Sequence, residues 1–173
     1  MSAIDQAIKA NQTYARKFEL SGLAMPPAAK VAVVACMDAR LTLEPMLGLK
    51  TGDAHIIRNA GGIVTEDVVR SLIISQQLLG TREVMIVNHT DCGMLTFKDA
   101  ELRTKLLKST GKLPVVPAQF SAFSSLEQNV RDQVLKLKTH PWMLPNLAVR
   151  GFIYDVKSGR LSEVSASEER KAA

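Results

Sequence analysis

Short, unbroken apolar runs constrain the fold of this 173-residue chain more than any other feature of its sequence. Residues 31–35 read VAVVA, and residues 84–87 read VMIV. Strands that are apolar at every position suit a parallel sheet whose two faces are both covered by helices. Residues 55–58 (HIIR) form a further expected strand. The sequence therefore predicts a buried, mainly parallel central sheet.

Helical patterns alternate with these strands. Thr65 is expected to cap a helix that runs to about residue 79, and Gly80 is expected to end it. Two more helices are expected over residues 3–20, where the apolar stripe is weak, and over residues 125–138. Strands that alternate with helices indicate an α/β fold with a mainly parallel central β-sheet flanked by helices.

The C-terminal part of the chain has a different pattern. Residues 149–154 and 161–164 flank a Lys-Ser-Gly turn and are expected to form a hairpin. Residues 97–118 contain one glycine and two prolines and predict no long element.

No repeat, linker or shift in composition divides the chain. We therefore expect residues 1–173 to form a single domain. Within it, residues 1–25 are expected to form an N-terminal helical arm, and the polar residues 166–173 a flexible tail.

Composition excludes several classes of protein. The formal charge is +5, but Lys and Arg are scattered, and only eight residues are aromatic, so no nucleic-acid partner is expected. No run approaches the ~20 apolar residues of a membrane span, and the N-terminus lacks a signal-peptide pattern. We expect a cytoplasmic protein with no membrane partner. Its two cysteines are too few for a disulfide framework.

Polar clusters follow two of the expected strands directly. Cys36 ends the first strand, and His89 and Cys92 follow the third. The carboxyl ends of neighbouring parallel strands meet at one edge of a sheet, where such folds bind ligands. Two thiolates and one imidazole make a three-ligand zinc set with one tetrahedral position open, which is typical of catalytic zinc. Buried, inert cysteines are the alternative interpretation, whereas a Cys-x-x-Cys redox pair is absent.

Asp38 and Arg40 come just after Cys36. In an extended segment they share a face with Cys36, so carboxylate and guanidinium are expected to pair beside the metal. A surface salt bridge of little consequence is the alternative. Gly61 and Gly62 indicate either a close backbone approach to the site or a simple turn. Backbone N–H groups near Gly93 are a further candidate for holding an anion.

Four strings in the right order resemble the β-carbonic anhydrase family. VVACMDARL resembles the first ligand motif with its Asp-Arg dyad, and VNHTDCGM resembles the second. GDAHIIRNAGG resembles the loop beside the active site, and RGFIYDVKSGRL the last strand pair. The likeness covers most of residues 30–165, with 97–125 the least similar part, and it is to the compact branch of the family.

The resemblance implies a zinc enzyme with one Zn²⁺ per chain, bound by Cys36, His89 and Cys92. It implies reversible hydration of CO₂ to bicarbonate by zinc-bound hydroxide, a lyase reaction. Asp38 and Arg40 are then the catalytic pair, with Gly61, Gly62 and Gly93 on the substrate side. It also implies a homodimer or a dimer of dimers, in which the N-terminal helix packs on the partner subunit.

Other functions stay open at this point. The compact branch also contains carbonyl sulfide hydrolases, so hydrolysis of carbonyl sulfide or carbon disulfide at the same zinc site is the main alternative. A non-catalytic zinc protein predicts a closed metal site, and a thiol redox protein predicts reversible oxidation of Cys36 and Cys92. The ligand motifs do not separate CO₂ from its sulfur analogues.

Overall fold

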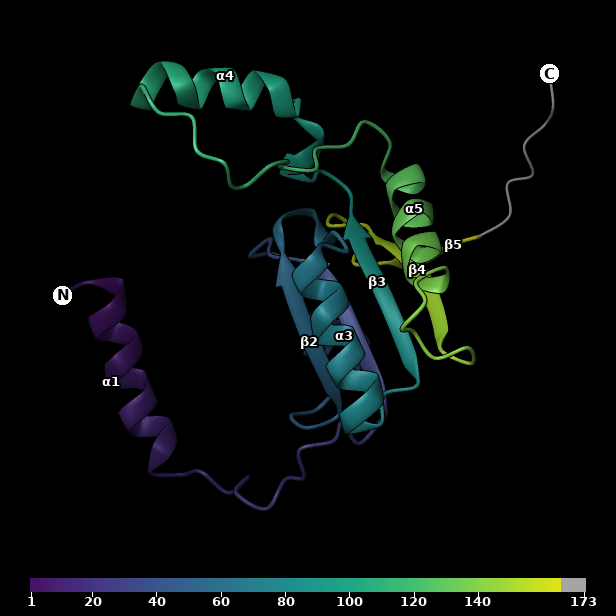
Figure 1. Cartoon of the computed structure of the whole chain (residues 1–173). Coiled ribbons are helices and arrows are strands. Elements are labelled where there is room, and N and C mark those ends of the chain that lie inside the picture. The colour runs from purple at the N-terminus through teal and green to yellow at the C-terminus, as the bar shows by residue number, and fades with distance from the viewer. Residues whose placement is uncertain (166–173) are drawn as a thin grey trace.

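A five-stranded sheet forms the centre of the structure, a computed structural model that describes residues 1–165. The strand order is β2-β1-β3-β4-β5 (Figure 1). The first four strands are parallel, and β5 runs antiparallel to β4. The bounds are β1 Val31–Cys36, β2 Ala54–Asn59, β3 Glu83–His89, β4 Ala148–Tyr154 and β5 Leu161–Val164. The predicted α/β class is confirmed, while the expected tail at 166–173 lies outside the described residues.

Helices cover the two faces of the sheet unequally. The longer helices α3 (Glu66–Leu79) and α5 (Leu126–Lys138) pack on one face, and the short α2 (Leu43–Leu47) packs on the other. On β1, Ala32 and Val34 point to the first face, whereas Val33 and Ala35 point to the second. The strand is therefore buried on both sides, which is why it is apolar at every position.

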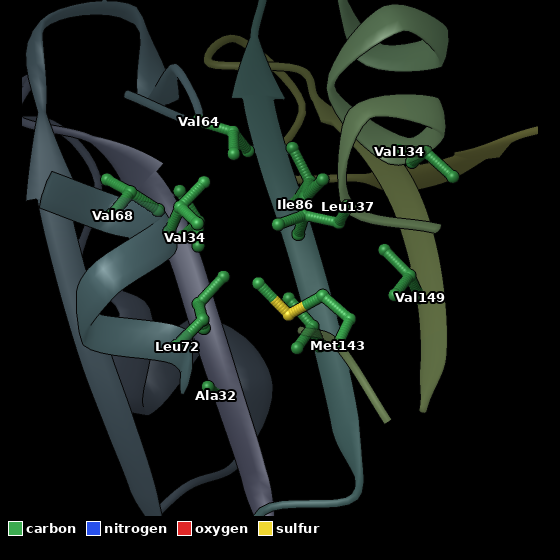
Figure 2. Packing of buried hydrophobic residues seen from close by; sticks show 12 residues of the cluster. Ala32, Val34, Val64, Val68, Leu72, Ile86, Val134, Leu137, Met143 and Val149 are labelled. Atoms are coloured by element: carbon green, nitrogen blue, oxygen red, sulfur yellow. The ribbon is translucent and has the colours of Figure 1, made fainter. Parts of the chain in front are cut away.

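The larger core lies between α3, α5 and the strands. Figure 2 shows Val68 and Leu72 of α3 beside Val34 of β1, and Leu137 of α5 beside Ile86 of β3. Leu72, Ile86 and Leu137 are at most 1% exposed. This packing fixes β1 and β3 side by side, with residues 31–35 paired in register with 83–87. The two strands consequently end at the same edge of the sheet.

Two helices stand away from this core. Helix α1 (Ala3–Ala15) and helix α4 (Asp99–Thr110) bury no residue, and Figure 1 shows both projecting from the sheet. In and just after α1, Ile4, Ile8, Tyr14 and Phe18 are all about half exposed or more. No helix within residues 1–165 is long and apolar enough to cross a membrane.

Most predicted elements are present, with some differences in extent. Thr65 caps α3 and Gly80 ends it in the left-handed conformation, and the C-terminal hairpin is formed. Helix α1 ends at Ala15, short of the expected residue 20. Helices α2 and α4 were not predicted. Both lack a side-chain cap at the N-terminus, and α4 has no buried face.

Helix α5 reaches the sheet closely because β4 carries a glycine. A Cβ placed on Gly151 would lie 2.9 Å from Cγ2 of Val134 and still closer to Cγ1 of Val130. We expect Gly151→Ala to destabilise the fold by about 1–3 kcal/mol, because an added methyl overpacks a full core. Chemical denaturation measures this, with the exposed Gly22→Ala, which meets nothing within 4 Å, as the control. Equal stability of the two variants would contradict the packing argument.

Candidate metal centre

Cys36, His89 and Cys92 come together where β1 and β3 end. Their ligand atoms all lie within 4.8 Å of one another, and all three residues are buried. Cys36 is the last residue of β1, His89 is the last of β3, and Cys92 follows a turn after β3. Both thiols are free rather than joined in a disulfide. The convergence follows from the adjacency of the two parallel strands.

The imidazole of His89 is held with one nitrogen aimed at the thiols. Nδ1 donates to the backbone oxygen of Thr90 at 2.8 Å, so Nε2 is the nitrogen that carries no proton when the ring is neutral. The His89 side chain is fully buried, and Nε2 has no hydrogen-bond partner among the described residues. An unpaired buried nitrogen beside two thiols is a donor set that fits Zn²⁺.

The two thiols differ in acidity. The pKa of Cys36 lies well below its ordinary value, chiefly because the neighbouring Cys92 thiol stabilises its thiolate, and His89 and nearby backbone groups act in the same direction. The pKa of Cys92 is raised because its thiol donates to Cys36 and because it is buried. Burial lowers the pKa of His89, but Cys36 and the Thr90 carbonyl outweigh this effect and raise it. A divalent cation bound by these three groups would displace the thiol protons, because cysteine binds metal as the thiolate.

Asp38 and Arg40 form a two-point ion pair beside this cluster. Arg40 donates from Nε to Oδ1 of Asp38 at 3.0 Å and from Nη2 to Oδ2 at 2.8 Å. The hydrogen bonds from Arg40 hold the pKa of Asp38 well below its usual range. Oδ2 lies 3.8 Å from Nε2 of His89, so the carboxylate borders the metal centre while Arg40 holds both its oxygens.

The pairing of Asp38 with Arg40 has a different local geometry from the one expected. The residues after Cys36 leave the extended conformation, and the Arg40 N–H donates to Oδ1 of Asp38 at 2.9 Å. A turn therefore brings the two side chains together, rather than alternation along a strand.

Arg40 has a second carboxylate partner, Asp91, which the sequence pattern does not predict. Its Nη1 donates to Oδ2 of Asp91 at 2.7 Å, and its Nη2 donates to the Asp91 carbonyl at 3.0 Å. Asp91 has a φ of 55°, a left-handed conformation that is uncommon outside glycine but tolerated by Asp and Asn. The Arg40 guanidinium is thus held by hydrogen bonds to both segments that carry candidate metal ligands, the one after β1 and the one after β3. The only sequence signal is the position of Asp91 next to Cys92.

Asp91→Asn is expected to lower turnover about two- to fivefold, because it removes an exposed charge from Arg40 but suits the left-handed backbone. The Asp91 side chain is 71% exposed, so a larger loss is not expected. Steady-state kinetics measure the effect. Glu163→Gln, which removes the carboxylate partner of the distant Arg150, is the matched control. Identical kinetics for both variants would contradict a role for Asp91.

Arg58 supports the first ligand segment from β2. It donates from Nε to the carbonyl of Cys36 at 3.0 Å and from Nη2 to the carbonyl of Asp38 at 2.6 Å. Two backbone carbonyls of the ligand turn are thereby satisfied.

Gly61 and Gly62 lie in a short 3-10 turn that packs against the end of β1. Both have positive φ values, 80° and 61°. A Cβ on Gly62 would lie 3.0 Å from the backbone N of Cys36, and a Cβ on Gly61 would lie 2.9 Å from Cγ of Met94. The structure places the loop next to the first ligand, and close packing explains both glycines. Gly93 is exposed and begins a three-residue 3-10 turn after Cys92.

An apolar wall surrounds the two thiols. Leu41 and Met94 form a buried cluster with Cys36 and Cys92, and Phe123 packs against it. Next to it lies a cavity of about 420 Å³ whose lining includes Leu95, Phe97 and Phe123. These three residues also belong to the wall, so the cavity and the metal centre share an apolar lining. The remaining histidines lie elsewhere: His55 Nδ1 is 2.7 Å from the Ser75 hydroxyl, and His140 packs edge-on against Trp142.

Comparison with known proteins agrees with this geometry. The family model described as carbonic anhydrase matches residues 31–161. "Beta-carbonic anhydrase 1" of Mycobacterium tuberculosis is 44% identical over 165 residues, covering 95% of this chain and 99% of that protein. A carbon disulfide hydrolase of Saccharolobus solfataricus is 33% identical, covering 91% and 87%.

Solved structures give the same result. The crystal structure of carbonic anhydrase from Streptococcus mutans superposes with a TM-score of 0.89 at 45% identity and covers 95% of this chain and 99% of that one. A carbonic anhydrase from Glaciozyma antarctica superposes with a TM-score of 0.87 at 41% identity, covering 95% and 100%. The matches span nearly the whole chain, and this protein belongs to the β-carbonic anhydrase family.

Proposed function

We propose that this protein catalyses the reversible hydration of CO₂ to bicarbonate and holds one Zn²⁺ per chain through Cys36, His89 and Cys92. The observation that carries the proposal is the buried set of two thiols and an unpaired imidazole nitrogen, with Asp38 alongside and held by Arg40. Three protein ligands leave one tetrahedral position open, as in catalytic zinc sites. When bound, Zn²⁺ lowers the pKa of water towards ~7 and so supplies a nucleophile near neutral pH.

Asp38 and Arg40 are the proposed catalytic pair. The lowered pKa keeps Asp38 ionised, so its carboxylate accepts a hydrogen bond from the attacking oxygen and turns that oxygen's lone pair towards the substrate carbon. Arg40 holds both carboxylate oxygens and so restrains Asp38 from becoming a fourth metal ligand. Asp91 in turn restrains Arg40.

The apolar wall suits an uncharged substrate. Met94 and Phe123 pack around the thiols and give the site an apolar side, on which an uncharged molecule pays little desolvation. Gly61, Gly62 and Gly93 are proposed to line the substrate side through backbone groups alone. Bicarbonate leaves as an anion, and the scattered positive charge of the chain favours small anions near the protein.

We propose a homodimer or a dimer of dimers, with α1 packed on the partner subunit. Support comes from α1 itself, which buries none of its residues against its own chain although Ile4 and Ile8 are apolar. A cytoplasmic location is proposed from the two free cysteines, because thiols persist in a reducing compartment. The substrate is the only proposed small-molecule partner.

Hydrolysis of carbon disulfide or carbonyl sulfide is the competing activity at the same ligands. The carbon disulfide hydrolase relatives have lower identity to this chain than the carbonic anhydrase of M. tuberculosis, 32–34% against 44%. Rates of CO₂ hydration and of sulfide release from carbon disulfide, measured on one zinc-loaded preparation, distinguish the two. We expect kcat/KM for CO₂ to exceed that for carbon disulfide at least a hundredfold. The reverse ratio would contradict the proposal.

A further inference from the structure

A row of side-chain amides, two buried and one half-buried, connects helix α5 to the loop of residues 61–64 beside the metal centre. The N–H of Val64 donates to Oε1 of Gln133 at 2.8 Å, and Nε2 of Gln133 donates to Oδ1 of Asn129 at 3.1 Å. Nδ2 of Asn129 donates to Oδ1 of Asn88 at 2.6 Å, and Nδ2 of Asn88 donates to the Gly61 carbonyl at 2.8 Å. The row starts and ends on the same loop and so forms a closed circuit.

Every hydrogen bond of the circuit runs in the same direction. Each amide accepts through its oxygen and donates through its nitrogen, so none can turn over without breaking both of its bonds. Asn88 and Asn129 are 1% and 7% exposed, so water cannot readily replace a lost partner. Bonds aligned in one direction polarise one another, and an unpaired buried amide is costly. The circuit therefore has one stable arrangement.

The loop that the circuit holds contacts the first metal ligand. Gly62 approaches the end of β1 so closely that a Cβ would lie 3.0 Å from Cys36 N and 2.8 Å from Nδ2 of Asn88. The same Cβ would lie 3.0 Å from the carbonyl carbon of Ala35, so the loop packs directly on the backbone that carries the Cys36 ligand. Asn88 also lies next to His89 in β3. A shift of the loop would thus disturb two ligand segments at once.

We propose that Asn88, Asn129 and Gln133 are positioning residues, whose circuit fixes the Gly61–Gly62 backbone against Cys36 and so shapes the substrate side of the metal centre. The effect on catalysis rests on the proposed function, whereas the effect on the loop does not. None of the three amides reacts. They act through the loop, which Asn88 contacts across 26 residues of sequence at Gly62 and Gln133 contacts across 69 residues at Val64.

The test compares two amides of the same helix. Asn129→Leu fills a similar volume but breaks two links of the circuit. Gln128→Leu removes an exposed amide whose contact is with Asp132, outside the circuit. In zinc-loaded Asn129→Leu, we expect backbone hydrogen exchange of residues 61–64 to accelerate at least tenfold, while β1 and β3 stay protected. We expect kcat to fall roughly ten- to hundredfold with zinc still at one ion per chain.

A second variant keeps the test decisive if Asn129→Leu does not fold. Asn129→Asp preserves shape and, at an alkaline pH where its carboxyl is ionised, cannot donate to Asn88, so it breaks the circuit at one link. Gln133→Leu, alone and combined with Asn129→Leu, adds a further check. Because both substitutions break the same circuit, the double variant should lose little more exchange protection and kcat than either single variant. Gln128→Leu is expected to stay within twofold of the parent in every measurement.

Each outcome decides the proposal. Unchanged exchange of residues 61–64 in folded Asn129→Leu or Asn129→Asp would overturn the circuit as the device that holds the loop. Faster exchange with unchanged kcat would overturn its positioning role. Failure of the parent protein to hydrate CO₂ would instead refute the proposed function, and the exchange measurement would still test the circuit.

Discussion

Cys92→Ser is expected to reduce bound zinc from one ion per chain to almost none after dialysis and to abolish CO₂ hydration. Serine has a similar size but supplies no thiolate, which is the form of cysteine that binds metal. With two ligands left, we expect zinc affinity to fall at least about a hundredfold, since even outer-sphere changes cost ten- to hundredfold. Metal analysis of the dialysed protein measures the loss directly.

Histidine offers a matched control for the same claim. His89→Ala should lose zinc as Cys92→Ser does, whereas His55→Ala should retain it, because His55 lies at the start of β2 and contacts Ser75. Circular dichroism establishes that each variant is folded. Zinc retained at parental affinity by Cys92→Ser or His89→Ala would refute the ligand assignment.

Asp38→Asn has the second large expected effect, because it should separate catalysis from metal binding. Asparagine keeps the volume of the side chain but removes the charge that Arg40 holds and that orients the attacking oxygen. We expect kcat to fall at least about a hundredfold, within the range for positioned acid–base groups, while zinc stays at one ion per chain. Stopped-flow kinetics and metal analysis on the same preparation provide both numbers.

An ion pair elsewhere on the surface controls for the loss of charge. Asp67 pairs with Arg70 at 2.7 Å on α3, and its side chain is 72% exposed. Asp67→Asn therefore removes the same charge from a more exposed ion pair outside the site and should leave turnover within twofold. If Asp38→Asn turned over as fast as Asp67→Asn, Asp38 would have no part in the reaction.

The sheet and its principal helices could be predicted because burial dictates their sequence. β1 lies between α3 and α2, so its positions 32 to 35 all face apolar side chains. Helix α3 carries both a cap at Thr65 and a stop at Gly80. By contrast, α4 buries no residue, so no apolar stripe marks it. Gly111, which reads as a break in the sequence, is the left-handed residue that ends α4.

Convergence of the three candidate ligands could also be predicted, because it depends only on adjacent strands ending at one edge. The supporting contacts could not. The contact of Asp91 with Arg40 needs a left-handed residue in a tight turn, which a single sequence does not reveal. Asn88 and Asn129 are 41 residues apart, and their contact depends on how α5 packs across β3 and β4. Such long-range polar pairs leave no periodic signal in the sequence.

The central claim is that zinc bound at this site hydrates CO₂, and stopped-flow hydration by the zinc-loaded protein at alkaline pH tests it most directly. We predict rapid hydration that a zinc chelator abolishes and that added Zn²⁺ restores. Hydration no faster than the uncatalysed rate, with one zinc per chain present in folded protein, would contradict the account.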